Sequence, residues 1–207
     1  MHSDTTTTLT QAIGAGIPQT ATSMARHAVQ TVGYDRTVGD NTWRTPVHVI
    51  KAVGRCDLDP CAATNARNEI AGKSFTEADD GLTKYWSQAD LAFVNPPYGN
   101  DTAKWAAKTA AHGNALLLVF ARTDTRWFHA SVWEHPNTSA VLFLEGRLRF
   151  RRENGTVAGS AGAPSVLIAY GEEARFRLAS AVARGTLCGH LVLLNNQPSL
   201  AQLALAA

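Results

Sequence analysis

The residues best suited to chemistry are Asn95, Pro96, Pro97 and Tyr98, which directly follow an apolar run at 91–94. The prolines have fixed φ angles and no N–H to donate, and Pro97 confines Pro96 to an extended conformation. A sheet ladder must therefore end here in a stiff turn. The turn offers two acceptors, the Pro96 carbonyl and the Asn95 side-chain oxygen, and Tyr98 adds a flat aromatic face.

This set suits a planar group that carries an exocyclic amine, such as adenine. Two acceptors can hold both hydrogens of the amine out of the ring plane, which frees the nitrogen lone pair to attack an electrophilic methyl group. Tyr98 would stack on the base, which is worth about 1–3 kcal/mol. A base inside a duplex would first have to be flipped out. The structural alternative is a proline-stiffened strand exit with a surface tyrosine.

The elements that must position these residues follow from periodicity and end signals. Apolar runs predict strands at 56–59, 91–95, 115–121, 139–146 and 165–171, whereas the polar stretch 61–81 is predicted to be loop with at most a turn of helix. Helices are predicted at 45–54, 101–114, 123–133 and 172–185, the first capped by Thr45 and opened by Pro46.

Strands separated by helices predict an α/β domain with a mostly parallel sheet flanked by helices. Ligands of such sheets bind at the carboxyl ends of the strands. The segment Asp59-Pro60-Cys61-Ala62 follows one predicted strand, and Asn95 to Tyr98 follow another. We therefore expect both segments on the same rim of the sheet.

Composition limits the class of protein. The chain has 207 residues, of which 45% are hydrophobic and 17% charged, and we expect a mobile tail at 1–38 and a single domain at 39–207. Three cysteines at irregular spacing predict no disulfide framework and a reducing, cytoplasmic setting. No apolar stretch reaches the ~20 residues of a membrane span. The net charge of +2 permits a nucleic-acid partner without arguing for one.

Five further segments occur in a fixed order along residues 41–171. They are WRTP (43–46), LDPCAATNARN (58–68), DDGLTKYW (79–86), ARTDTRWFH (121–129) and LEGRLRF (144–150). Together with NPPY, they resemble segments of the S-adenosylmethionine-dependent DNA N6-adenine methyltransferases, in particular the small phage and prophage type.

The resemblance implies a Rossmann-like methyltransferase fold, S-adenosylmethionine as the cofactor with S-adenosylhomocysteine as its product, and DNA as the partner, in the cytoplasm of a bacterial host. The reaction itself needs no metal. Catalytic roles fall on Asn95, Pro96, Pro97 and Tyr98, and cofactor contacts on Thr45, Pro46, Asp59, Pro60, Cys61, Ala62, Asp79, Asp80 and Asn95. The glycine-rich turn of the wider superfamily is missing at 61–65, so no cofactor contact is predicted in the part of this turn that follows Ala62, residues 63–65.

The densest basic cluster comprises Arg147, Arg149, Arg151 and Arg152, and a run of small residues follows it at 153–164. On an extended segment, alternate residues share a face. We expect this cluster, together with Arg122, to contact DNA phosphates or bases. A solvated strand edge is the structural alternative for the cluster, and a capping pair with Asp124 is the alternative for Arg122.

Three functions stay open at this point. The first is methylation of adenine N6 in DNA, which the ordered segments and the arginine cluster favour. The second keeps the chemistry but changes the amine to cytosine N4 or a glutamine side chain, both of which suit NPPY. The third is a DNA-binding module without catalysis, which the glycine-free turn motivates. The target sequence and the oligomeric state are not predicted.

Overall fold

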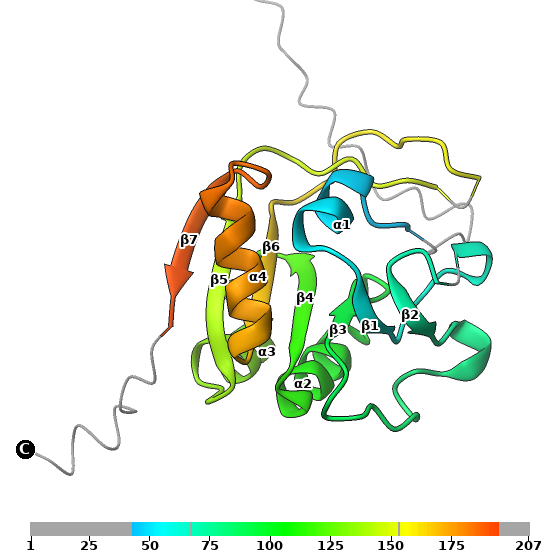
Figure 1. Cartoon of the computed structure of the whole chain (residues 1–207), viewed down its shortest axis with the longest axis horizontal. Helices are drawn as coiled ribbons and strands as arrows, with labels where there is room; N and C mark the ends of the chain where they lie inside the picture. Colours follow the sequence, from blue (N-terminus) through cyan, green and yellow to red (C-terminus); the bar gives the residue numbers. More distant parts are fainter. Residues whose placement is uncertain (1–42, 67, 153, 195–207) are drawn as a thin grey trace, which may run out of the picture. The chain divides into compact units, whose positions relative to one another are not determined.

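The computed structural model describes residues 43–66, 68–152 and 154–194, which Figure 1 shows in colour. The tail expected at 1–38 lies outside these residues. In the described part of the chain, no helix combines the length and the apolar character that a membrane span requires.

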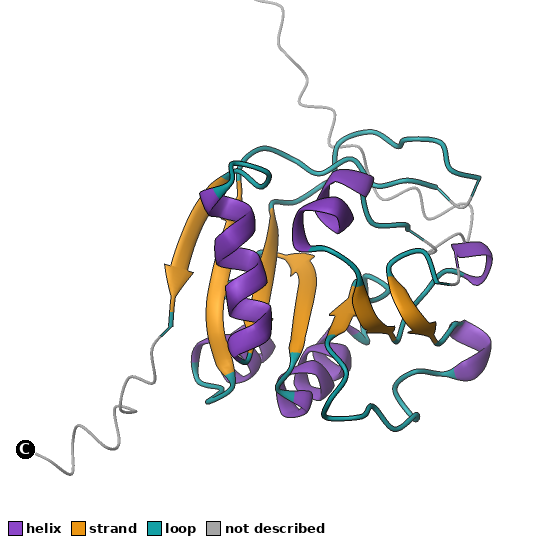
Figure 2. Cartoon of the chain, viewed as in Figure 1, coloured by secondary structure: helices purple, strands orange, loops and turns teal. Residues whose placement is uncertain are grey.

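A sheet of seven strands in the order β2-β1-β3-β4-β6-β5-β7 forms the centre of the fold (Figure 2). The strands are β1 (Cys56–Asp59), β2 (Ala71–Ser74), β3 (Ala92–Val94), β4 (Ala115–Phe120), β5 (Thr138–Leu144), β6 (Ser165–Tyr170) and β7 (Gly189–Leu193). Neighbours from β2 to β4 are parallel, whereas β6 runs antiparallel to β4 and β5, and β7 runs antiparallel to β5.

The prediction of a mostly parallel sheet is therefore right for the first half and wrong for the second. The reason lies in the connection between β5 and β6, whose described residues, 145–152 and 154–164, contain no helix. Parallel neighbours need a crossover that is usually helical, whereas a chain that turns back directly pairs antiparallel.

The helices are α1 (Val47–Val53), α2 (Thr102–His112), α3 (Arg126–Phe128) and α4 (Glu172–Ala183). Short 3₁₀ turns occur at Thr64–Ala66 and Glu77–Asp79, and α3 continues into a π-helical turn at His129–Trp133. The helix predicted at 123–133 is thus shorter and partly π-helical. The loop predicted at 61–81 also contains the edge strand β2.

Helices cover both faces of the sheet, and Figure 1 shows α1 and α4 in front of it. Side chains of α1 and α4 share one core cluster with Leu116 and Leu118 of β4. Side chains of α2 and α3 share a second cluster with Leu117 and Val119 of the same strand. Because successive residues of a strand point to opposite faces, the continuous apolar run of β4 is buried on both sides, as predicted.

The start of α1 differs from the prediction. The helix begins at Val47 with Pro46 in the capping position, and the Thr45 hydroxyl makes no capping hydrogen bond. Pro46 has extended backbone angles, and its carbonyl accepts the N–H groups of Val49 and Ile50. The Thr45 side chain therefore does not cap the helix.

Candidate active site

The strand order reverses at β1, because the chain passes first to β2 on one side and then to β3 on the other. Open α/β sheets bind ligands at such a switch point, beyond the carboxyl ends of the strands. A pocket lies at this place. It is lined by Trp43, Arg44, Thr45, Asp59, Cys61, Ala62, Ala63, Ala66, Glu69, Ile70 and Asn95.

The predicted cofactor-binding residues divide into two groups. Thr45, Asp59, Cys61, Ala62 and Asn95 line the pocket, whereas Pro46, Pro60, Asp79 and Asp80 do not. Of the predicted catalytic residues, Asn95 alone lines it. The expectation that the segments after β1 and β3 share a rim is confirmed.

Asp59 ends β1 with its side chain only 4% exposed. Burial raises the pKa of its carboxyl from the usual 3.8 to about 7, although hydrogen bonds from the backbone N–H and the thiol of Cys61 oppose the shift and nearby Glu69 adds to it. The Cys61 N–H lies 3.1 Å from Asp59 Oδ1. Near neutral pH the carboxyl is therefore a mixture of protonated and ionised forms, and a nearby cation would favour ionisation.

Cys61 links the end of β1 to the end of β3: it follows β1, and its sulfur is hydrogen-bonded by the N–H of Asn95, which follows β3. Burial and the adjacent Asp59 carboxyl raise the pKa of its thiol well above the usual value, and the Asn95 N–H, which hydrogen-bonds the sulfur, lowers it. The thiol is protonated at neutral pH, so it acts as a small, weakly polar side chain in the pocket wall.

The Asn95 amide is held from both ends. Its Nδ2 donates to the Trp43 carbonyl at 3.2 Å, and its Oδ1 accepts from the Tyr98 hydroxyl at 3.3 Å. The bond to Trp43 fixes which end of the amide is the acceptor. Asn95 thus presents Oδ1 on the side of Tyr98.

Tyr98 belongs to a cluster of three aromatic rings. Its ring stacks on Phe120 with centroids 4.3 Å apart and an interplanar angle of 23°. Phe150 meets it edge-on at 5.7 Å and 72°. Phe120 ends β4 and Phe150 lies in the β5–β6 connection, so three separate segments fix the orientation of the ring.

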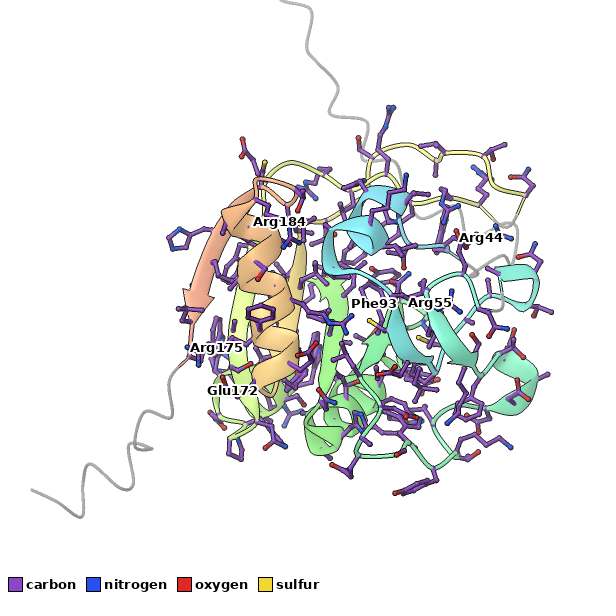
Figure 3. All side chains as sticks on the ribbon, viewed as in Figure 1. Arg44, Arg55, Phe93, Glu172, Arg175 and Arg184 are labelled. Carbon is purple, nitrogen blue, oxygen red and sulfur yellow. The ribbon has the colours of Figure 1, made fainter. Side chains whose placement is uncertain are left out.

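The segment 43–45 forms one wall of the pocket and contains two buried polar atoms without a hydrogen-bond partner. These are the Thr45 hydroxyl, on a side chain only 1% exposed, and the Arg44 Nε. Buried polar groups are rarely left unsatisfied in folded proteins. Two unsatisfied groups in the wall of one pocket therefore favour a polar ligand there. Arg44 lies on the side of the sheet where β1 and β2 run (Figure 3).

Glu69 is a pocket residue that sequence reasoning did not identify. Its carboxylate forms an ion pair with Arg151 Nη2, and its second oxygen lies 3.9 Å from Arg44 Nη1. The same Arg44 guanidinium donates to the carbonyl and the side-chain oxygen of Asn65. Arg44 and Glu69 are 25 positions apart, and Arg151 lies a further 82 positions along the chain, so no local pattern predicts this cluster.

Asp79 and Asp80, which were expected to contact the cofactor, do not line this pocket. The Asp79 carboxylate accepts hydrogen bonds from the N–H and the hydroxyl of Thr76, at 2.8 and 2.9 Å, and so closes a capping box. Asp80 is exposed, with a positive φ of 50°. Gly81 then packs so closely on Pro60 that an added Cβ would lie 1.9 Å from its carbonyl oxygen. The segment thus supports the end of β1 from outside the pocket.

Most of the predicted DNA-binding arginines are exposed. Arg147, Arg149 and Arg152 lie in the β5–β6 connection, and Arg122 follows β4. The connection is an irregular hairpin and not a strand, with hydrogen bonds between residues 148 and 161, 150 and 158, and 152 and 156. We call its residues 148–152 and 154–161 the arginine hairpin.

Arg151 departs from this pattern. Its guanidinium donates to the Thr45 carbonyl at 2.9 and 3.3 Å and pairs with Glu69, and its side chain is only 16% exposed. Its backbone also pairs with that of Arg44. Arg151 therefore fastens the hairpin to the pocket wall instead of facing solvent.

Comparison with known proteins identifies the family. A family described as DNA N-6-adenine-methyltransferase (Dam) matches residues 35–188 of the chain. The chain belongs to this family. The "DNA N-6-adenine-methyltransferase" of Escherichia phage T1 is 25% identical over 158 residues, which cover 63% of this chain and 64% of the phage protein. The chain thus spans less than two thirds of the length of that relative. No solved structure matches this chain.

The match to the DNA N-6-adenine-methyltransferase family covers all residues that line the pocket and all of the arginine hairpin. It ends at Cys188, directly before β7. The edge strand β7 is therefore an addition to the part of the fold that the family match covers.

Proposed function

We propose that this protein transfers a methyl group from S-adenosylmethionine to N6 of an adenine in DNA, and that its α/β fold is the Rossmann-like fold of methyltransferases. The observation that carries the proposal is the Asn95 amide, oriented by Trp43 at the rim of a switch-point pocket, in a chain of the DNA N-6-adenine-methyltransferase family. We place the reaction in the cytoplasm of a phage-infected or prophage-bearing bacterium.

The pocket residues suit the methyl donor. S-adenosylmethionine, when bound, supplies an electrophilic methyl group on a positively charged sulfur. The unsatisfied Thr45 hydroxyl and Arg44 Nε would bind its polar groups, and the Asp59 carboxyl would face its positive charge. Ala62 is small enough to let a ligand approach the end of β1. These features support the cofactor assignment despite the glycine-free turn.

The amine would be held by Asn95 Oδ1 and the Pro96 carbonyl. Oδ1 has two lone pairs, so it can accept from the amine with one of them while the other keeps the hydrogen bond from the Tyr98 hydroxyl at 3.3 Å. Pro96 is buried and both prolines are stiff, so the turn holds its acceptor still while the amine is bound. Fixed acceptors aimed at the charge that develops on nitrogen stabilise the transition state without rearranging.

A flipped base would stack on the face of Tyr98 that points away from Phe120, because a separation of 4.3 Å leaves no space between those two rings. Phe120 and Phe150 then act as supports that keep the Tyr98 ring in place. We assign the DNA contacts to the exposed Arg122, Arg147, Arg149 and Arg152, and a structural role to Arg151.

Product analysis tests the proposal. Double-stranded and single-stranded DNA are incubated with labelled S-adenosylmethionine and digested to nucleosides. We expect label in N6-methyl-2′-deoxyadenosine. Label in N4-methylcytosine or in protein would favour the second function, and absence of S-adenosylmethionine binding by calorimetry, with DNA present, would favour the inactive DNA-binding module.

A further inference from the structure

Glu69 joins three parts of the molecule that are far apart in sequence. It lies in the loop between β1 and β2 and lines the pocket. Its partners are Arg44, in the pocket wall, and Arg151, in the arginine hairpin. One carboxylate therefore contacts both the wall that would bind the methyl donor and the hairpin that would bind DNA.

The contacts continue from these arginines to the catalytic amide. The backbones of Arg44 and Arg151 exchange two hydrogen bonds of 2.9 and 3.1 Å. The Arg151 side chain holds the Thr45 carbonyl, and the carbonyl of Trp43, directly before Arg44, holds the Asn95 amide. A displacement of the arginine hairpin would thus be passed to the segment 43–46 and from there to Asn95.

The charges of this cluster are poorly screened. The side chains of Arg44 and Arg151 are each 16% exposed, and that of Glu69 is 29% exposed. Partly buried charges interact more strongly than fully solvated ones. Removal of the Glu69 charge would leave two neighbouring guanidinium groups without their shared anion. They would repel each other, and the hairpin would be held to the pocket wall only by the hydrogen bonds of Arg151 with Thr45 and with the Arg44 backbone.

We infer that Glu69 is a positioning residue that couples DNA binding at the arginine hairpin to the donor pocket and to Asn95. This inference rests on the proposed function, because it needs both ligands. It requires that DNA and the donor strengthen each other's binding through the ion pairs of Glu69, by thermodynamic reciprocity. Glu69 itself touches neither the amine nor the methyl group.

The test is calorimetry with S-adenosylhomocysteine, which cannot react, in the presence and absence of a DNA duplex. For the wild-type protein we expect the duplex to tighten S-adenosylhomocysteine binding by about tenfold, a typical coupling. In Glu69→Gln, which keeps the shape and removes the charge, we expect this ratio to fall below about twofold. The matched control is Glu77→Gln, at an exposed acid outside the pocket, which should keep the wild-type ratio.

A wild-type coupling ratio in Glu69→Gln would overturn the inference, even if its melting temperature fell, because the residue would then be merely structural. Independent binding of the two ligands to a wild-type protein that methylates DNA would also overturn it and leave the proposed function intact. A wild-type protein that binds no S-adenosylhomocysteine would remove both. If Glu69→Gln does not fold, Arg151→Lys decides, since lysine keeps the charge but cannot span the Thr45 carbonyl and Glu69 together, and it should lower the ratio in the same way.

Discussion

Replacement of Asp59 by asparagine should change how stability depends on pH. Burial raises the pKa of this carboxyl from 3.8 to about 7 in the folded protein. Because the folded value is the higher one, the contribution of Asp59 to stability is fully present below about pH 4 and is lost as the pH rises through about 7. At 1.36 kcal/mol for each pKa unit, the loss is on the order of 4 kcal/mol. The side chain is 4% exposed, so solvent screening reduces this figure little.

The asparagine introduced by Asp59→Asn would keep an oxygen to accept the Cys61 N–H but would carry no charge. The assay is urea unfolding of Asp59→Asn and wild-type protein, followed by tryptophan fluorescence at several pH values from about 4.5 to 8. Other titrating groups act in both proteins and largely cancel in the difference. The free energy of unfolding of the variant, relative to wild type, should rise by about 3–4 kcal/mol across this range and level off above about pH 7. A difference that stays constant with pH would refute the reasoning.

Three further predictions concern the surroundings of the site. Gly81→Ala should lower the free energy of unfolding by about 1–3 kcal/mol or more, measured by urea, because its Cβ would clash with the Pro60 carbonyl; an unchanged midpoint would contradict the packing. Tyr98→Phe should keep the methylation rate within a few-fold, whereas Tyr98→Ala should raise the transition-state free energy by about 1–3 kcal/mol through lost stacking; equal rates for the two would exclude a stacking role. Arg149→Ala should reduce the slope of DNA affinity against salt concentration by about one phosphate contact, measured by fluorescence anisotropy, and an unchanged slope would remove this residue from the DNA interface.

The part of the site that the sequence predicts is the part that depends on local chemistry. Pro96 and Pro97 end β3 whatever the tertiary fold, because neither can donate a backbone hydrogen bond. Parallel strands, in turn, bring their carboxyl ends to one edge of the sheet. Asp59 and Asn95 could therefore be assigned to one rim from strand order and turn chemistry alone, and both line the pocket. The long apolar run of β4 likewise predicts a strand that is covered on both faces.

The part that could not be predicted depends on contacts between distant residues. Glu69 is an unremarkable loop acid until folding brings Arg44 and Arg151 to it. Arg151 looks in sequence like its neighbour Arg149, and only the tertiary fold shows that one is held inside and the other exposed. The edge strand β2 is short and largely polar, so it has no apolar periodicity to reveal it.

The place of Asp79 had a readable signal in the sequence. Thr76 and Asp79 are three residues apart, which is the spacing of a capping box. This spacing predicts that the Asp79 carboxylate is used by the backbone. It therefore speaks against a role for Asp79 in binding the cofactor ribose.

The central claim, that the Asn95 amide activates the amine, is tested most directly by the rate of methyl transfer to DNA in Asn95→Ala. The control is Asn100→Ala, an exposed asparagine five residues further along. We predict that Asn95→Ala loses at least about 10²–10³-fold in rate, while its affinity for S-adenosylmethionine stays close to that of wild type and Asn100→Ala remains active. A rate for Asn95→Ala within a few-fold of wild type would contradict the claim.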